Sequence, residues 1–396
     1  MSECGVKEFK LRELLKIYNG TKYDHLNKGD IPLYGSGGLM SHVNEALYSG
    51  EAILLPRKGT LSNIMYVNES FWTVDTMYYA VVNDKLADAF YLYSYLSQLD
   101  LSNLDSGSTL PSMTKSAYES IVVKLPDLKI QKAVATILFN IRKKLETNNK
   151  INQELEAMAK TLYDYWFVQF DFPDQNGKPY KSSGGKMVYH PELKREIPEG
   201  WGVAKVEDIA QTGSGGTPKS TNVSYYSNGE IPWINSGELE QTVITSTSNF
   251  ITEEGLNNSS AKLFPSGTIL VAMYGATAGK VSFLTFEAST NQAICAIMLT
   301  DIRMRYYLKN VIEDLYQYLV KLSTGSARDN LSQDMIKNIK VVIPSNDILD
   351  RFYDFSNNII KEITKKQQEN EQLTQLRDWL LPMLMNGQVK VDNYTD

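Results

Sequence analysis

Two different rhythms of hydrophobic and polar residues alternate along the chain. Residues 31–82 contain short apolar and aromatic runs, AILL, IMYV and FWTVDTMYYAVV, separated by Gly, Pro and Asn, which is typical of β-strands joined by turns. A helical stretch at 86–99, a Gly-containing loop and the short strand IVVKLP at 121–126 come next. After Pro126 the apolar positions recur at spacings of four and three, which predicts a long helix with a heptad seam.

The same order of elements then returns, so the chain contains an internal repeat. IPLYGSGGL at 31–39 matches IPWINSGEL at 231–239, AILLPRKGT at 52–60 matches TILVAMYGA at 268–276, and DSGSTLPSMTKSAYESIVVKLP at 105–126 matches STGSARDNLSQDMIKNIKVVIP at 323–344. The counterpart of the helical stretch is RMRYYLKNVIEDLYQYLVKL at 303–322. The distance between matched blocks grows along the chain, which indicates insertions in the second copy.

The two predicted long helices carry matching seams. The first is expected at Ile130, Val134, Ile137, Ile141, Lys144, Asn148, Ile151, Leu155, Met158, Leu162 and Tyr165, and the second at Ile348, Phe352, Phe355, Ile359, Glu362, Lys366, Glu369, Leu373, Leu376 and Leu380. Both seams become polar near the middle, which favours an antiparallel coiled coil within one chain. Two alternatives stay open: each helix packs on its own globular domain, or the coil forms with a second chain. Pro382 is expected to end or kink the second helix.

These elements predict an α+β protein with a pseudo-two-fold internal repeat, in which two tandem α/β-type domains are separated by the two long helices. The expected boundaries are 1–126 for the first globular domain and 127–170 for the first spacer helix. Residues 171–344 are expected to hold a linker and the second globular domain, and 345–396 the second spacer helix and a C-terminal tail. The Pro- and Gly-rich stretch 171–202 is interpreted as a connector.

Composition narrows the class of protein. The 396 residues are 42% hydrophobic, and no apolar run approaches the ~20 residues that span a bilayer. MSECGVKEFKLREL lacks the apolar core of a signal peptide, so a cytoplasmic location without membrane contact is expected. Two cysteines and three histidines form no spaced ligand cluster, so no metal site is predicted. The net charge of −6 counts mildly against a nucleic-acid partner, although local clustering of cations decides whether phosphates are attracted.

MYGATAGKV at 273–281 has some features of a nucleotide-binding loop. That loop has four residues between its glycines, followed by Lys and then Ser or Thr. Here three residues separate Gly275 from Gly279, and Val281 follows Lys280. The equivalent stretch of the first copy, KGTLSNIM at 58–65, has no second glycine. A Gly-rich turn between two strands is therefore favoured.

Two similar domains held apart by a rigid pair of helices suit a long polymer that is read at two separated points, and duplex DNA is the obvious case. The sequence also resembles the specificity (S) subunits of type I restriction–modification systems. The residues that carry the resemblance are GDIPLYGSGG at 29–38, LLPRKGT at 54–60, FWTVDTMYYA at 71–80, TLYDYWFVQFDFP at 161–173, EIPEGWG at 196–202, GSGGTPKS at 213–220 and RDWLLPMLMNGQV at 377–389.

The resemblance implies a chain that catalyses nothing itself. Each globular domain is then a target-recognition domain that reads one half of a bipartite, asymmetric site in double-stranded DNA. The helices set the spacer and bind two modification subunits, which carry S-adenosylmethionine and methylate adenine, while two restriction subunits add an ATP- and Mg-dependent motor and nuclease. No cofactor is expected in this chain, which also lacks the Asp/Asn-Pro-Pro-aromatic tetrapeptide that such a methyltransferase needs to hold a flipped adenine.

The candidate DNA-contacting residues lie in Gly turns and matched blocks, where small residues let the backbone approach phosphates. Arg57 is a candidate for a guanine edge or a phosphate, and Lys58 and Lys219 are candidates for phosphate. The full set is Lys22, Tyr34, Ser36, Arg57, Lys58, Gly59, Ser106, Gly107, Ser108, Thr109, Thr217, Pro218, Lys219, Trp233, Asn235, Tyr274, Thr324, Gly325, Ser326 and Arg328. For Tyr34 and Trp233 a packing role is the favoured alternative.

Aromatic and charged residues near the expected helix ends are candidates for contact with partner proteins. They are Tyr165, Trp166, Phe167, Arg377 and Trp379. The alternative is that these rings cover the linker. Two other functions also stay open for the chain: a coiled-coil scaffold that binds only protein, and a nucleotide-using enzyme that depends on the Gly-Lys pair.

Overall fold

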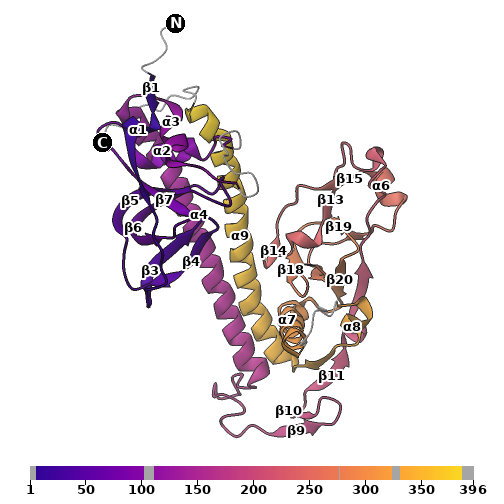
Figure 1. Ribbon diagram of the computed structural model, residues 1–396. Coiled ribbons are helices and arrows are strands. Elements are labelled where there is room, and N and C mark those ends of the chain that lie inside the picture. The colour runs from indigo at the N-terminus through magenta and orange to yellow at the C-terminus, as the bar shows by residue number, and fades with distance from the viewer. Residues whose placement is uncertain (1–5, 102–110, 276, 323–330, 386–396) are drawn as a thin grey trace. The chain divides into compact units, whose positions relative to one another are not determined.

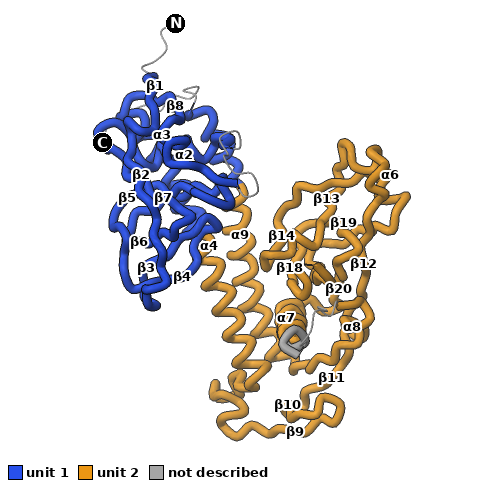
Figure 2. The backbone as a smooth tube through the Cα atoms, in the orientation of Figure 1, with its two compact units in different colours: residues 1–146, 372–396 blue, residues 147–371 orange. Residues whose placement is uncertain are grey.

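The structure is a computed structural model that describes residues 6–101, 111–275, 277–322 and 331–385. The chain divides into two compact units, residues 1–146 with 372–396 and residues 147–371 (Figure 2). The two long helices, α4 (Leu128–Tyr163) and α9 (Asn346–Met385), each contribute a part to both units. The linear domain boundaries expected from the sequence are a different kind of division and stay a prediction.

Unit 1 is built on a six-stranded sheet in the order β2-β7-β5-β6-β3-β4. Its strands are β2 (Leu15–Asn19), β3 (Lys28–Gly35), β4 (Gly38–Val43), β5 (Tyr48–Pro56), β6 (Met65–Thr73) and β7 (Met77–Val82) (Figure 1). An antiparallel pair, β1 (Lys7–Lys10) with β8 (Val122–Leu125), and the helices α1 (Leu11–Leu14), α2 (Ala89–Leu96) and α3 (Lys115–Ser120) complete the described part of the unit. The helix α2 confirms the helical stretch predicted at 86–99.

Both faces of the central strand β5 are buried, which explains the unbroken AILL run in the sequence. Ala52 and Leu54 belong to a cluster on one face of the sheet, while Ile53 and Leu55 belong to a larger cluster on the other. Successive side chains of a strand point to opposite faces, so a strand covered on both sides is apolar at every position. The side chains of the larger cluster include Leu92 of α2, Leu138 of α4 and Leu384 of α9.

Unit 2 contains a five-stranded sheet in the order β12-β20-β17-β18-β14 and a four-stranded sheet in the order β15-β13-β19-β16. The strands are β12 (Ala210–Ser214), β13 (Ile231–Ile234), β14 (Val243–Ile244), β15 (Phe250–Ile251), β16 (Leu263–Phe264), β17 (Ile269–Ala272), β18 (Val281–Leu284), β19 (Ala288–Thr290) and β20 (Ile294–Leu299). Unit 2 also contains two separate antiparallel pairs of strands. They are β9 (Met187–His190) with β10 (Arg195–Pro198) and β11 (Gly202–Lys205) with β21 (Lys340–Ile343). In addition to its parts of α4 and α9, unit 2 contains the helices α5 (Val206–Ile209), α6 (Glu253–Asn257), α7 (Arg305–Leu322) and α8 (Gln333–Lys337).

Strand pairing confirms the internal repeat. Each unit contains an equivalent parallel pair of strands, β3 with β6 in unit 1 and β13 with β19 in unit 2. The paired residues, which fall on the matched blocks IPLYG and IPWIN, are Leu33–Trp72 and Tyr34–Thr73 in the first copy and Trp233–Ser289 and Ile234–Thr290 in the second. The neighbouring loops repeat a backbone hydrogen bond of 2.8 Å, from Thr21 N to Thr73 O and from Gly216 N to Thr290 O.

Within unit 2, α4 and α9 form an antiparallel pair. Asn148 of α4 donates from Nδ2 to Oδ1 of Asn370 at 2.9 Å. Phe167, which follows α4, lies with its ring centroid 4.7 Å from that of Phe352. Progress along α4 therefore corresponds to return along α9, as the two seams predicted. The helices also pack on their own globular parts, since Leu138 and Phe352 both belong to domain cores.

The predicted seams are right at every second position and shifted by one residue at the others. Confirmed seam positions that are buried include Val134, Ile141, Asn148, Phe352 and Ile359. Predicted positions that are instead exposed include Ile130, Ile151, Met158, Tyr165 and Leu376. The buried side chains that replace them lie one residue further along, and include Gln131, Leu138, Ala159, Trp166 and Ile363. The error arises because spacings of four-then-three and three-then-four fit an apolar pattern almost equally well when apolar residues also flank the seam.

Two further expectations are corrected. Of the two outcomes expected at Pro382, an end of the helix is wrong because α9 continues to Met385, and a kink stays a prediction. The stretch 171–202 is more than a connector, because β9 and β10 pair within it and Phe172 is stacked on Trp201 with ring centroids 4.8 Å apart. Spacing of Pro and Gly in the sequence does not reveal such a local aromatic core.

Candidate nucleic-acid interface

In unit 1, the loops that follow β3 and β5 meet at one edge of the sheet. Ser36 lies in the turn between β3 and β4, and Gly59 follows β5 with a φ of +90°. A Cβ added at Gly59 would lie 2.9 Å from Ser36 Oγ, so the two loops are closer than a larger residue allows. Asn63 ties the loops together by donating from Nδ2 to the carbonyl oxygen of Ser36 at 2.9 Å. The structure therefore brings two of the predicted candidate loops together.

The cations of this edge are not neutralised by carboxylates. The Arg57 backbone N–H bonds to Thr76 O at 2.8 Å, and its Nη1 donates to the backbone oxygen of Asp75 at 3.3 Å. Arg57 is half-buried and Lys58 is exposed. Neither forms an ion pair within the described ranges, so both charges are available to phosphate oxygens.

Tyr34 and Lys22 belong to the same unit and differ in their surroundings. Tyr34 donates from its hydroxyl to Oε1 of Glu69 at 3.0 Å. Burial, followed by that hydrogen bond, raises the pKa of Tyr34 to about 12, so the phenol stays neutral. Lys22 is exposed just beyond the end of β2. Tyr34 thus combines packing with a polar contact, while Lys22 is a surface cation of the described chain.

The second unit builds its loops from a different set of side chains. The hydroxyl of Thr217 is hydrogen bonded to Oε1 of Gln292, and Pro218 O accepts from the hydroxyl of Tyr226 at 2.5 Å. Lys219 is exposed in this loop. Trp233 is only 9% exposed and donates from Nε1 to Gly216 O at 2.9 Å. Trp233 therefore acts on the loop by packing and anchoring it, in line with the alternative given for this residue.

Two more candidate loops of unit 2 meet as those of unit 1 do. Thr277 donates from Oγ1 to the carbonyl oxygen of Ser236 at 2.7 Å, as Asn63 does to that of Ser36. Asn235, beside Ser236, accepts through Oδ1 from Asn291 Nδ2 at 3.4 Å. Tyr274, in the turn after β17, is 37% exposed. The residues missed in the sequence are Asn63, Thr277, Asn291 and Gln292. Asn63 and Thr277 are donors of different type that make the equivalent contact in the two copies, so a comparison of the copies does not reveal them.

The described residues of the MYGATAGKV stretch belong to a hairpin turn. It joins the antiparallel strands β17 and β18, whereas a phosphate loop leads from a strand into a helix. Gly275 and Gly279 have φ values of +91° and +76°. A Cβ at Gly279 would lie 2.0 Å from Cγ of Tyr316, so helix packing and backbone conformation account for this glycine.

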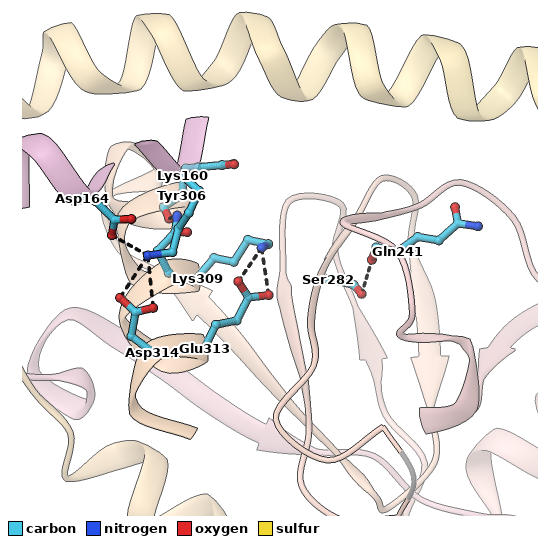
Figure 3. A network of polar contacts seen from close by, with 9 residues as sticks. Lys160, Asp164, Gln241, Ser282, Tyr306, Lys309, Glu313 and Asp314 are labelled. Atoms are coloured by element: carbon cyan, nitrogen blue, oxygen red, sulfur yellow. Dashed lines mark hydrogen bonds and ion pairs between the residues drawn. The ribbon is translucent and has the colours of Figure 1, made fainter. Parts of the chain in front are cut away.

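A charged cluster lies between α4 and α7 in unit 2 (Figure 3). Lys160 pairs with Asp164 at 2.5 Å and with Asp314 at 3.2 Å, and Lys309 pairs with Glu313 at 2.8 Å. Burial lowers the pKa of Lys160, but the hydrogen bonds and charges of Asp164 and Asp314 outweigh it and raise the pKa overall. Lys160 of α4 therefore connects α4 to α7 through Asp314, while the pair of Lys309 and Glu313 lies within α7.

Of the candidate partner-binding residues, two are buried. Trp166 and Phe167 are 7% and 4% exposed, and the ring centroid of Phe167 lies 6.0 Å from that of Trp201. Phe167 thus packs on the 171–202 stretch, in line with the alternative that the rings cover the linker, and Trp166 packs against Phe352 with ring centroids 5.9 Å apart, so neither ring is exposed for docking. Tyr165 is 39% exposed and Trp379 is 58% exposed. Arg377 pairs with its neighbour Asp378 at 2.8 Å.

Some predicted candidates lie outside the described residues, namely Ser106, Gly107, Ser108, Thr109, Thr324, Gly325, Ser326 and Arg328. They stay predictions. In the part of the chain that is described, no group of three or more His, Cys, Asp or Glu side chains could hold a metal ion. Among the described helices, none combines the length and apolar character that crossing a bilayer requires.

Comparison with known proteins agrees with this architecture. The family model for the type I restriction modification DNA specificity domain matches residues 3–157 and 198–375, one match for each copy of the repeat. The MjaIX specificity subunit of a type I restriction enzyme from Methanocaldococcus jannaschii is 27% identical over 297 residues, which cover 74% of this chain and 66% of that protein. The HindI specificity subunit from Haemophilus influenzae is 27% identical over 333 residues, covering 71% of this chain and 72% of that protein.

The fold has been seen before in a solved structure. A crystal structure of the type I restriction–modification system S subunit from M. genitalium superposes with a TM-score of 0.67 and covers 99% of this chain and 98% of that one. The two sequences are 13% identical, so this match concerns the fold. Because the family model matches well over half of the sequence, once in each repeat, the chain belongs to the family of type I restriction–modification DNA specificity proteins.

Proposed function

We propose that this chain is the DNA sequence-specificity subunit of a type I restriction–modification complex, and that each globular domain reads one half of a bipartite site. The observation that supports this most directly is the repeated loop edge. In both copies a side chain after β5 or β17 donates to the carbonyl oxygen of a serine, Ser36 or Ser236. The backbone frame is shared while the exposed side chains differ, which suits two readers of unlike half-sites.

In the proposed complex this chain binds DNA and does not itself catalyse a reaction. Arg57, Lys58 and Lys219 contact DNA, with Arg57 the candidate for a bidentate contact to guanine. We further propose that two modification subunits bind the helices near Tyr165 and Trp379, that two restriction subunits complete the complex, and that the complex works in the cytoplasm. S-adenosylmethionine, ATP and Mg then belong to those partner subunits.

The test is to coexpress the full chain with its cognate modification subunit and map N6-methyladenine across the host genome. A bipartite motif with two unlike halves is expected. Arg57→Ala is expected to relax one position in one half only, at a cost of about 1–3 kcal/mol in discrimination. Lys178→Gln, an exposed lysine of the linker, is the matched control and should leave the motif unchanged. Methylation without any sequence preference would favour the scaffold alternative and refute the proposal.

A further inference from the structure

A pocket of about 490 Å³ in unit 2 lies between the turn before β17, the end of β18 and α9. Arg305, Lys361 and Lys365 line it, and none of its lining residues is acidic. Four other pockets of the described chain differ in this respect. Glu156, Glu240 and Glu313 offset the lysines of one, Asp174, Glu199 and Asp347 line another, and Asp378 and Glu154 line two more. A concave site with three cations and no carboxylate is a site for an anion.

The guanidinium of Arg305 is only partly compensated by the protein. Its Nη2 donates to Oδ1 of Asn357 at 2.5 Å, and its Cζ lies 5.8 Å from the ring centroids of both Phe283 and Tyr353. Its Nε is buried without a hydrogen-bond partner in the described part of the chain. Burial lowers the pKa of Arg305, as expected for a cation that has lost water and has no counter-ion. A bound anion would restore the missing electrostatic compensation.

Lys361 and Lys365 add two exposed charges on the same face of α9. They are four residues apart, so their side chains are neighbours on the helix surface. Neither forms an ion pair with another described residue. Two like charges at this spacing destabilise a helix, and an anion bound between them would reverse that effect. Ser266 contributes an exposed hydroxyl at another wall of the pocket.

We propose that this pocket binds a phosphate group, held by the planar guanidinium of Arg305 and the point charges of Lys361 and Lys365. Arg suits the bidentate geometry of phosphate oxygens, and Lys adds charge without strict geometry. The phosphate belongs either to the backbone of bound duplex DNA, outside the loops that read bases, or to a small phosphate compound. Only the first source rests on the proposed function.

The test uses the full chain and two variants of matched charge. Lys361→Gln/Lys365→Gln removes two exposed cations of the pocket, and Lys178→Gln/Lys181→Gln removes two exposed cations of the linker as the control. Arg305→Lys is a third variant that keeps the positive charge but loses the planar guanidinium that binds two phosphate oxygens at once. Because Arg305 is half-buried and its variant can fail to fold, the exposed lysine pair carries the test, with circular dichroism confirming folding.

The first arm measures binding of a labelled random-sequence duplex by fluorescence anisotropy between about 50 and 200 mM salt. The pocket is proposed to hold one phosphate group. Loss of its neutralisation in Lys361→Gln/Lys365→Gln is expected to lower the slope of log K against log salt by about 0.9, which is a change of about 3.5-fold in affinity over this range. The second arm measures saturable binding of inorganic phosphate and pyrophosphate by ³¹P NMR. A lower slope in the pocket variant but not in the linker variant assigns the phosphate to DNA.

An unchanged slope together with weaker phosphate or pyrophosphate binding by the pocket variant assigns the site to a small phosphate compound. If neither measurement distinguishes the pocket variant from the linker variant, the inference is overturned. Failure of the wild-type chain to bind any duplex counts against the proposed function, whereas the second arm still decides whether the pocket binds phosphate.

Discussion

A buried pair of amides joins α4 and α9 inside unit 2, and replacing one of them is a direct test of the helix register. Asn148 is 0% exposed and donates from Nδ2 to Asn370 Oδ1 at 2.9 Å and to Glu369 Oε2 at 3.0 Å. Asn370 in turn donates from its own Nδ2 to Asn149 Oδ1 at 2.8 Å. A polar residue at a seam position of a coiled coil sets the register at a cost in stability.

The size of the effect follows from these hydrogen bonds. Asn148→Ala removes one neutral hydrogen bond and one bond to a carboxylate, and it leaves Asn370 Oδ1 without this donor. A neutral bond contributes about 1 kcal/mol, a bond to a charged group about 2 kcal/mol, and an unsatisfied buried acceptor costs about 1–3 kcal/mol more. Asn148 Oδ1 is itself buried without a partner among the described residues, so its removal offsets part of the cost. We expect a net destabilisation of about 3 kcal/mol.

The double variant Asn148→Leu/Asn370→Leu distinguishes a specific interaction between the two amides from a site that is destabilised by any substitution. Replacing both partners with apolar groups removes the unmet polar atoms, so we expect the double variant to lie within about 1 kcal/mol of wild type. Glu369 keeps Lys366 at 3.1 Å in both cases. Urea unfolding followed by circular dichroism measures the midpoints, and equal m-values are required for the comparison. Asn140→Ala, at an exposed position of α4, is the control and is expected to change little.

The reasoning is refuted if the destabilisations of Asn148→Leu and Asn370→Leu simply add in the double variant, because the two amides would then not interact. It is also refuted if Asn148→Ala costs no more than Asn140→Ala.

Three further changes test other parts of the structure. Gly279→Ala meets the ring of Tyr316 and a φ of +76°, so a destabilisation of about 3 kcal/mol is expected, against about 1 kcal/mol for Gly275→Ala, which has open space around it; urea unfolding of both measures the difference. Tyr91→Phe removes a buried hydroxyl that has no partner in the described chain, so stability at pH 7 should be unchanged or up to about 1 kcal/mol higher. Burial raises the pKa of Tyr91 to about 12, so above pH ~10 the unfolded chain loses this proton more readily than the folded chain. The free energy of unfolding of the wild type should therefore fall as the pH rises from ~10 toward 12, and a pH series of unfolding should be flatter in the variant. Lys219→Ala should weaken DNA binding uniformly across sequences and reduce the salt slope by about one, whereas an unchanged slope would remove Lys219 from the interface.

Periodicity predicted most of the architecture because it reports burial directly. The AILL run predicted a strand, and its four residues are covered on both faces of the sheet. The helix seams were harder to assign. Ile151 and Met158 are apolar but exposed, while the polar Gln131 and the small Ala159 are buried, so hydrophobicity alone misplaced half of the seam by one residue.

The candidate site was predictable only as far as its loops share a pattern. Gly59 and Gly275 mark both turns in the sequence, and both have positive φ values, 90° and 91°. The donors that tie each turn to the neighbouring loop are Asn63 in one copy and Thr277 in the other, and they occupy different places relative to those glycines. No comparison of side-chain types between the copies reveals them.

This difference has a physical reason that bears on how the two halves diverge. In both copies the acceptor is a backbone carbonyl, that of Ser36 or Ser236, and a carbonyl accepts from an amide or a hydroxyl alike. The tie therefore constrains only the presence of a donor, and leaves the exposed residues of each loop free to vary. A loop edge held through backbone acceptors can change what it reads without changing how it folds. Exchange of Asn63 for Gln or Thr277 for Ser should accordingly preserve folding, while removal of the donor in Asn63→Leu should loosen the Ser36 turn and raise its amide hydrogen exchange.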